Sequence, residues 1–307
     1  MQELGTKIKE EAKRLGFIAT GISKAALLEE EREYLRKWLD NEQHAGMGYM
    51  ANHFQKRTDP RFLVDDARAV ISVLMPYRPS KEQKDKSYLI SKYAFGKDYH
   101  RVFKDRLFQL FDFVKKLAPE AKGRVFVDSA PVMDKVWAAR SGLGWMGKNT
   151  NLLSKQFGSF FFVGELIVNL ELEQDEPVTD YCGNCTRCVD ACPTNALAPY
   201  RLDAGRCISY LTIEHQGKIP DEFKGSWEKW IFGCDICQDV CPWNKKAKIT
   251  ADPELKPLEV LLEMTGKDWE ELTDKKFKEL FGESALERTG YEGIMRNIHF
   301  LNDQEKK

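Results

Sequence analysis

Apolar residues recur with helical spacing in some segments of this chain and run without interruption in others. Near the N-terminus their spacing of three or four predicts a helix over residues 4–15 that ends at Gly16. Residues 29–40 predict a second helix. Residues 69–75 are continuously apolar and rich in β-branched side chains, and Pro76 closes the run. This pattern is typical of a buried central strand.

The longest amphipathic stripe follows residues 93–99 and predicts a helix that ends before Pro119. Its apolar members are Phe103, Leu107, Leu110, Phe111, Val114 and Leu117. We interpret the stripe as core, because any helix docked on a protein shows such spacing. Residues 124–127 predict a short strand, and residues 132–140 predict a helix that carries Asp134.

Residues 160–170 predict a long apolar strand that contains one carboxylate, Glu165. Because Glu is rarely buried without a partner, Glu165 either lies at the edge of a sheet or is a hydrogen-bonded member of a site. The acidic segment that follows, residues 171–180, contains Pro177, and we place a domain boundary there.

Three glycines just before this strand match the dinucleotide-binding pattern G-x-G-x-x-G: Gly142, Gly144 and Gly147. That motif has to follow a strand and open a helix, whereas here it follows a predicted helix. We therefore interpret it as a Gly-rich turn, which lets backbone amides approach a bulky or anionic group.

The cysteines are confined to one stretch of the chain. They read Cys182-x2-Cys185-x2-Cys188-x3-Cys192-Pro193, then Cys207, then Cys234-x2-Cys237-x3-Cys241-Pro242. Thiolate runs of this spacing followed by Pro are typical of bacterial ferredoxins, in which the fourth cysteine of a run binds the other cluster.

The eight cysteines divide into two sets of four. The first thiol set is Cys182, Cys185, Cys188 and Cys241. The second thiol set is Cys192, Cys207, Cys234 and Cys237, where Cys207 fills the place missing from the second run. A zinc ribbon is one alternative, although zinc has no reason to prefer the x3-Cys-Pro ending. A disulfide framework is another, and a chain of this length without a signal peptide argues against it. We therefore expect two 4Fe–4S clusters as cofactors.

The composition is that of an ordinary globular protein, with 42% hydrophobic and 31% charged residues among 307. A net charge of -1 gives no overall attraction to nucleic acid, so RNA contact would need a local basic face. Lys245, Lys246 and Lys248 could touch phosphate, although such a run is usually a solvated face. No apolar run approaches the roughly 20 residues that span a bilayer, and we expect no membrane contact. Iron–sulfur ligands imply the cytoplasm.

Several blocks of sequence are similar to the signature blocks of the epoxyqueuosine reductase family, and together they extend over nearly the whole chain. These blocks are residues 127–131, 142–150, 207–214 and 233–244. The resemblance implies an oxidoreductase that depends on cobalamin and iron–sulfur clusters, related to the reductive dehalogenases. It implies reduction of the epoxide of epoxyqueuosine, at the wobble position of tRNA, to queuosine, the last step of queuosine biosynthesis.

The resemblance also implies an α+β fold of three parts. Residues 1–175 are expected to form a nitroreductase-like α/β cobalamin domain, and residues 176–250 a ferredoxin-like domain with two clusters. Residues 251–307 are expected to form a short helical segment similar to the start of the helical-repeat domain of longer members. We expect either a short member of the family or a shortened chain, and a monomer.

Asp134 is the expected general acid, because removal of an epoxide oxygen as water consumes two electrons and two protons. The sequence alone favours an exposed helix carboxylate, which is what most Asp residues are, and the resemblance reverses this in favour of the catalytic role. The resemblance implies further cobalamin contacts, each of which could also be a surface or cap residue. These residues are Arg57, Lys97, Asp134, Ser154, Gly158, Ser209 and Gln216.

His100 is not expected to bind cobalt. Asp98, Tyr99 and His100 begin the pattern D-x-H-x-x-G, but Phe103 stands where that pattern requires Gly. No flavin or nicotinamide signature is visible, so we expect an external low-potential electron donor of the ferredoxin or flavodoxin type. The alternatives are a corrinoid reductase of a small substrate, like the reductive dehalogenases, and an electron-transfer ferredoxin fused to a helper domain.

Overall fold

The computed structural model describes residues 2–227 and 229–303. Residues 304–307, the end of the expected helical segment, lie outside the described residues, as do residues 1 and 228. No helix in the described ranges combines the length and the apolar character needed to cross a membrane.

A four-stranded antiparallel sheet with the order β1-β2-β7-β4 forms the centre of the N-terminal half. Its strands are β1 (Ala19–Lys24), β2 (Ala69–Pro76), β7 (Phe161–Val168) and β4 (Gly123–Phe126). Every residue of β2 is buried, as expected for the uninterrupted apolar run. In the register, Glu165 of β7 lies beside Ser72 on one side and Phe126 on the other, so this carboxylate is in the interior of the sheet.

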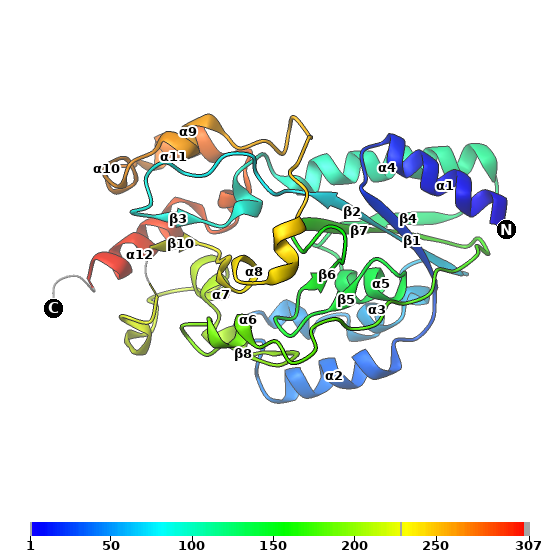
Figure 1. Cartoon of the computed structure of the whole chain (residues 1–307), viewed down its shortest axis with the longest axis horizontal. Helices are drawn as coiled ribbons and strands as arrows, with labels where there is room; N and C mark the ends of the chain where they lie inside the picture. The colour runs from blue at the N-terminus through cyan, green and yellow to red at the C-terminus, as the bar shows by residue number, and fades with distance from the viewer. Residues whose placement is uncertain (1, 228, 304–307) are drawn as a thin grey trace.

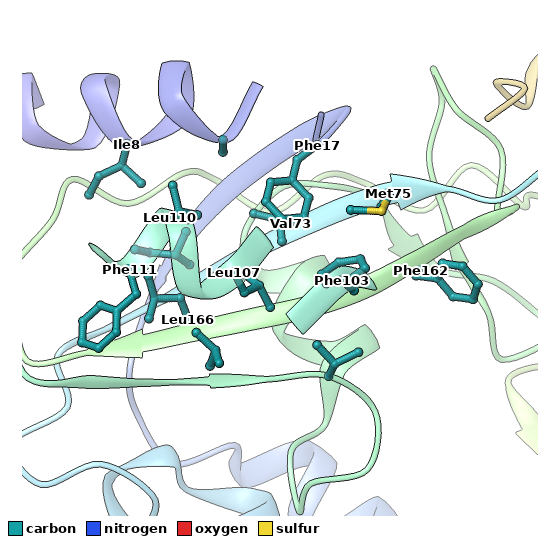
Figure 2. Packing of buried hydrophobic residues seen from close by; sticks show 14 of the residues in the cluster. Ile8, Phe17, Val73, Met75, Phe103, Leu107, Leu110, Phe111, Phe162 and Leu166 are labelled. Carbon is teal, nitrogen blue, oxygen red and sulfur yellow. The ribbon is translucent and has the colours of Figure 1, made fainter. Parts of the chain in front are cut away.

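Two helices cover one face of this sheet, α1 (Gln2–Arg14) and α4 (Tyr99–Leu117) (Figure 1). Their apolar stripes pack against side chains of β2 and β7, and Figure 2 shows Phe103, Leu107 and Leu110 of α4 over the strands. Asp98 begins α4 by accepting a hydrogen bond from the backbone N–H of His100. The predicted stripe is confirmed except at its end, because Leu117 is 40% exposed where the last turn passes beyond the sheet.

Gly164 allows α4 to pack this closely on β7. A Cβ atom at this position would lie 2.4 Å from the ring of Phe103, a distance that real side chains do not show. The Phe103 ring is fully buried there. Burial of such a ring stabilises the fold by about 1.5–3 kcal/mol.

The opposite face of the sheet carries α5 (Asp134–Arg140), together with α2 (Glu29–Asp40) and α3 (Phe54–Thr58) (Figure 1). Trp137 of α5 is buried against Ile167 of β7 and Phe126 of β4. Ile167 and Glu165 are two residues apart on β7 and therefore share this face. The packing of Trp137 thus places the first turn of α5 over Glu165.

A second apolar core is built by the C-terminal half and by residues 88–95, which are supplied from the N-terminal half. The strand β3 (Leu89–Ile90) pairs in parallel with β10 (Trp230–Phe232). The helices around this core are α7 (Ile208–Ile213), α9 (Glu259–Glu263), α10 (Gly266–Glu270), α11 (Asp274–Phe281) and α12 (Gly290–Asn302). The strand pairing ties the two halves of the chain together.

The cysteine-bearing segments lie between these two cores, around α6 (Arg187–Asp190) and α8 (Ile236–Asp239) (Figure 1). Two small hairpins stand beside them, β5 (Trp145–Met146) with β6 (Leu152–Leu153), and β8 (Leu197–Ala198) with β9 (Arg201–Leu202). The three glycines follow α5 and lead into the β5–β6 hairpin, so the turn is not a strand-to-helix dinucleotide site.

Short 3₁₀ helices complete the connections. They are η1 (Gly48–Met50), η2 (Pro60–Phe62), η3 (Lys92–Ala94), η4 (Ala204–Arg206), η5 (Asp221–Phe223), η6 (Pro242–Lys246) and η7 (Ala285–Arg288).

Candidate active site and thiol sets

Two carboxylic acids meet where α5 begins above the sheet. Asp134 is the first residue of α5, and its Oδ1 atom is buried. Glu165 of β7 is completely buried. The two carboxyl groups interact, and Oδ1 of Asp134 and both oxygens of Glu165 lack a well-aligned hydrogen-bond donor in the described part of the chain. Two such acids cannot both ionise cheaply in an apolar environment, so one proton stays on the pair.

Burial raises the pKa of Asp134 to about 6, and the nearby charge of Asp128 acts in the same direction. A hydrogen bond with Glu165 opposes these two effects. Burial also raises the pKa of Glu165 well above its ordinary range, with further contributions from Asp134 and Asp128. Asp134 can therefore hold or release a proton near neutral pH, as a general acid requires.

Arg57 lies close enough to Asp134 for their charges to interact. Its guanidinium donates a hydrogen bond of 3.0 Å to the backbone oxygen of Tyr49, while its Nε atom is buried without a partner among the described residues. Removal from water lowers the pKa of Arg57, and the charge of Asp134 opposes that effect. The structure thus brings together two of the predicted site residues, Arg57 and Asp134.

Asp128 closes another side of the site, in the loop after β4. The hydroxyl of Tyr99 donates a 2.7 Å hydrogen bond to Asp128, and the ring of His100 lies 3.3 Å from the same oxygen. The other ring nitrogen of His100 lies 2.7 Å from Asp98. Burial alone would lower the pKa of His100, but the hydrogen bonds with the two carboxylates outweigh it and raise the pKa to about 9. A protonated imidazole is a poor metal ligand. That His100 does not bind cobalt stays a prediction.

Lys135 connects the acid pair with the second thiol set. Its Nζ atom donates to the backbone oxygen of Thr150 at 3.2 Å and to the Asn151 side chain at 3.1 Å. Lys135 is exposed at the surface, and the thiols of Cys237 and Cys207 and the nearby carboxylates lie within electrostatic reach of its ammonium. The side chain after Asp134 thus lies within electrostatic reach of the second thiol set.

The eight cysteines are free, and their division into two ligand sets stays a prediction. Cys188 interacts with Cys241 and Cys182, and Cys241 with Cys182 and Cys185. In the second set Cys207 interacts with Cys192, and Cys234 with Cys237. Burial and these neighbouring thiols raise the pKa values of Cys234 and Cys237.

The first thiol set lines a cavity of about 290 Å³. Its four members all contribute to the cavity wall, with Trp145 Nε1 donating to Cys182 Sγ at 3.5 Å. Within residues 2–227 and 229–303, no three His, Cys, Asp or Glu side chains converge on a point that could hold a single metal ion. Four thiols spaced around a cavity fit a multi-atom cluster bound from several sides.

The four members of the second thiol set are each half-buried. Backbone N–H groups of Tyr210 and Ser209 donate to the Cys207 thiol, because Cys207 stands at the beginning of α7. Backbone amides aimed at sulfur are typical of cluster ligands and help hold them as thiolates. The donor chemistry of both sets therefore fits iron–sulfur clusters.

Five predicted site residues lie elsewhere. The ammonium of Lys97 pairs with Glu254 at 3.4 Å, and Gln216 is exposed after α7. Ser209, in the first turn of α7, lies beside the second thiol set. Ser154 and Gly158 form a backbone bridge, and a Cβ on Gly158 would lie 2.3 Å from the side-chain oxygen of Asn244. Roles for these five residues in holding cobalamin stay predictions.

The sequence analysis left the position of Glu165 open and did not single out Lys135. A lone Glu in an otherwise apolar strand was the available signal for Glu165. Lys135 offered no signal, because its position depends on the meeting of α5 with the cysteine segments in space.

Two family models match the chain. Residues 181–244 match the 4Fe-4S double cluster binding domain. Residues 57–129 match the family described as "Epoxyqueuosine reductase QueG, DUF1730". The first match covers both thiol sets, and the second begins at Arg57 and ends just after Asp128.

Proteins named epoxyqueuosine reductase are similar to nearly the whole of this chain. Epoxyqueuosine reductase from Cellulophaga algicola is 57% identical over 96% of this chain and 96% of its own length. The crystal structure of an epoxyqueuosine reductase with an epoxyqueuosine-modified tRNA-Tyr stem loop superposes with a TM-score of 0.91 at 30% identity. That comparison covers 99% of this chain and 82% of the other.

The reductive dehalogenase NpRdhA is a more distant structural neighbour, with a TM-score of 0.51 and 13% identity over 96% of this chain and 35% of that chain. This likeness concerns the fold alone. The identity with the curated relative and its coverage of both chains decide the family. The chain belongs to the epoxyqueuosine reductase family.

Proposed function

We propose that this chain reduces the epoxide of epoxyqueuosine in tRNA to the alkene of queuosine, the last step of queuosine biosynthesis. One observation carries the proposal: Asp134, the protonatable member of the acid pair, begins the helix whose next residue, Lys135, lies within electrostatic reach of the second thiol set. Protons and electrons can therefore be supplied to one place. Loss of an epoxide oxygen as water requires two protons and two electrons.

Asp134 serves as the proton donor to the departing oxygen. Its pKa of about 6 leaves an appreciable protonated fraction at neutral pH. Glu165 shares a proton with Asp134 from inside the sheet and is itself sealed from solvent. Arg57 lies on the same site and can orient a bound group through its unpartnered Nε.

Cobalamin is the cofactor that we propose for this site. The buried, unpartnered polar atoms of Asp134 and Arg57 fit a bound molecule that carries amide groups, which could satisfy both. When bound, cobalamin supplies a strongly reduced cobalt centre as nucleophile or one-electron donor. We propose that the residues holding it are Arg57, Lys97, Asp134, Ser154, Gly158, Ser209 and Gln216.

The two thiol sets hold 4Fe–4S clusters that relay electrons from an external low-potential donor. The first set lies on the open cavity, and the second lies within electrostatic reach of Lys135. Electrons therefore enter at the first set and pass to the second. We propose that the reaction takes place in the cytoplasm, where thiols stay reduced. We propose a monomer in three parts, residues 1–175, 176–250 and 251–307, with epoxyqueuosine tRNA as substrate.

The test is an anaerobic assay. Purified protein reconstituted with iron, sulfide and cobalamin is incubated with epoxyqueuosine tRNA and dithionite, and the nucleosides are analysed by mass spectrometry. We expect the modified nucleoside to lose one oxygen atom. Retention of that oxygen by protein with full iron and cobalt content would contradict the proposal. Turnover of halogenated phenols in place of the tRNA would support the small-substrate alternative.

A further inference from the structure

The charged side chains that line the cavity at the first thiol set are all of one sign. The cavity is lined by the four cysteines, by the aromatic rings of Tyr181 and Trp243, and by three cations, Lys148, Arg187 and Lys246. No carboxylate is among its lining residues. Since the whole chain has a net charge of -1, this positive rim is a local feature.

These cations are available to a partner. None of Lys148, Lys155, Arg187 and Lys246 has a salt bridge with any residue whose position the structure describes. Lys148 donates to the backbone oxygen of Gly183 at 2.6 Å, which holds its ammonium at the cavity. We call Lys148, Lys155, Arg187 and Lys246 the basic rim.

The two carboxylates nearest in sequence to the cysteines of the first run, Asp180 and Asp190, have other hydrogen-bond partners. Asp180 accepts hydrogen bonds from the backbone N–H of Cys182 and from the hydroxyl of Tyr200. Asp190 accepts a 2.7 Å hydrogen bond from the hydroxyl of Thr186. Neither forms a salt bridge with the basic rim in the described structure.

Aromatic rings lie at the centre of the rim. Tyr181 is 45% exposed, and the Lys155 ammonium lies 4.9 Å from its ring centre. Tyr181, Trp145 and Trp243 are in mutual contact, with ring centres 5.2–6.0 Å apart. An exposed Tyr and a partly exposed Trp, beside an unpaired Arg, are residue types enriched at protein-binding surfaces. This surface lies over the first thiol set.

We propose that the basic rim is the docking surface for a reduced, acidic one-electron carrier protein of the flavodoxin or ferredoxin class. The inference rests on the proposed function and names the partner of its electron-entry site. Each encounter oxidises the carrier by one electron and reduces the centre held by the first thiol set by one. Two encounters supply the two electrons that the epoxide consumes, and no covalent bond forms between the proteins.

Charge complementarity is what favours this partner. Electron-transfer complexes are small and short-lived, usually burying less than about 1,200 Å², so opposite charges steer the encounter more than area does. A polyanionic RNA would also be attracted to cations. The rim, however, surrounds the thiols, whereas the acid that serves the substrate lies beside the second set.

The test compares two double charge reversals of the reconstituted holoenzyme. Arg187→Glu/Lys246→Glu changes the rim, and Lys13→Glu/Lys104→Glu makes the same charge change at exposed positions of α1 and α4. Binding of an oxidised flavodoxin and of an oxidised plant-type 2Fe–2S ferredoxin is measured by calorimetry at low and high salt. Iron content and dithionite-driven turnover are measured for both variants.

We expect the rim variant to weaken carrier binding by at least about tenfold at low salt, because two attractive contacts become repulsive. High salt should weaken the binding of the unmodified protein and reduce the difference. The control variant should match the unmodified protein. Iron content and dithionite-driven turnover should be unchanged in both.

Equal carrier affinity of the rim variant and the control would overturn the proposal, as would failure of both carriers to bind the unmodified protein. A loss of tRNA affinity with unchanged carrier affinity would make the rim an RNA contact instead. Failure of the proposed function would look different: dithionite would then drive no epoxide reduction even in the unmodified protein, whereas carrier binding would still report on the rim.

Discussion

The two thiol sets are similar in ligand type and different in surroundings. The first lines an open cavity with a basic rim and the exposed ring of Tyr181. The second is held at the beginning of α7 and lies within electrostatic reach of Lys135, next to the acid pair. Their surroundings assign the sets different tasks, electron entry for the first and delivery for the second.

The largest expected effect comes from removing one ligand of each set. Cys237→Ser should abolish epoxide reduction with any reductant, because the second set lies next to the site. Cys185→Ser should abolish turnover driven by a carrier protein and leave measurable turnover driven by dithionite, which is small enough to bypass the first set. Each variant should lose the iron of one cluster. Equal residual activities of Cys237→Ser and Cys185→Ser with dithionite would contradict the assignment of different roles to the two thiol sets.

The next effect concerns the proton. Asp134→Asn should lower turnover by at least about 100-fold, the usual contribution of a general acid, while iron and cobalamin content stay unchanged. Asp112→Asn, at an exposed position of α4, is the matched control. Single-turnover rates with excess enzyme provide the measurement. Turnover of the Asp134 variant within a few-fold of the control would remove this residue from the role.

A smaller effect should appear in the pH profile. An acid must be protonated to act, so kcat/KM should fall as the pH rises through the Asp134 pKa of about 6. Glu165→Met removes the hydrogen bond that lowers this pKa, so the falling limb should move to higher pH by about one unit. Glu165→Gln keeps a donor and should move it less. If the falling limb of the pH profile had the same position in Glu165→Met as in the unmodified protein, Glu165 would have no influence on the pKa of Asp134.

The smallest effect is on stability. The folded-state pKa of Glu165 is raised, so its contribution to stability is complete below the unfolded-state pKa and is lost as the pH rises toward the folded-state value. Between these two pKa values, the free energy of unfolding of the unmodified protein should fall by up to about 1.4 kcal/mol per pH unit relative to that of Glu165→Gln. Thermal unfolding of both proteins at pH 5 and pH 8 measures this. A difference independent of pH would show that Glu165 is ionised when folded.

Local patterns predicted the elements well where periodicity is strong. The buried run at residues 69–75 became β2, and the stripe after residue 99 became α4. The spacing of the cysteines predicted the double-cluster domain, because ligand geometry is largely local in such runs. The assignment of each cysteine to one set stays a prediction. Leu117 was assigned wrongly, since helical spacing continues beyond the edge of the sheet that the helix covers.

Features that depend on long-range register could not be predicted. The pairing of β3 with β10 joins segments about 140 residues apart, and neither strand is long enough to show periodicity. The acid pair needs Glu165 to face α5, which depends on the packing of Trp137. Of the five proposed cobalamin contacts outside the acid site, Ser154 and Gly158 are bridged to each other, and the shared role of all five depends on a bound molecule.

The most direct test of the account is elemental analysis of anaerobically purified, cobalamin-incubated protein. The account predicts iron and sulfide equivalent to two 4Fe–4S clusters per chain, one cobalt per chain, and loss of one cluster's iron in Cys185→Ser or Cys237→Ser. Zinc in place of iron, or a protein that binds no cobalamin while holding both clusters, would contradict it.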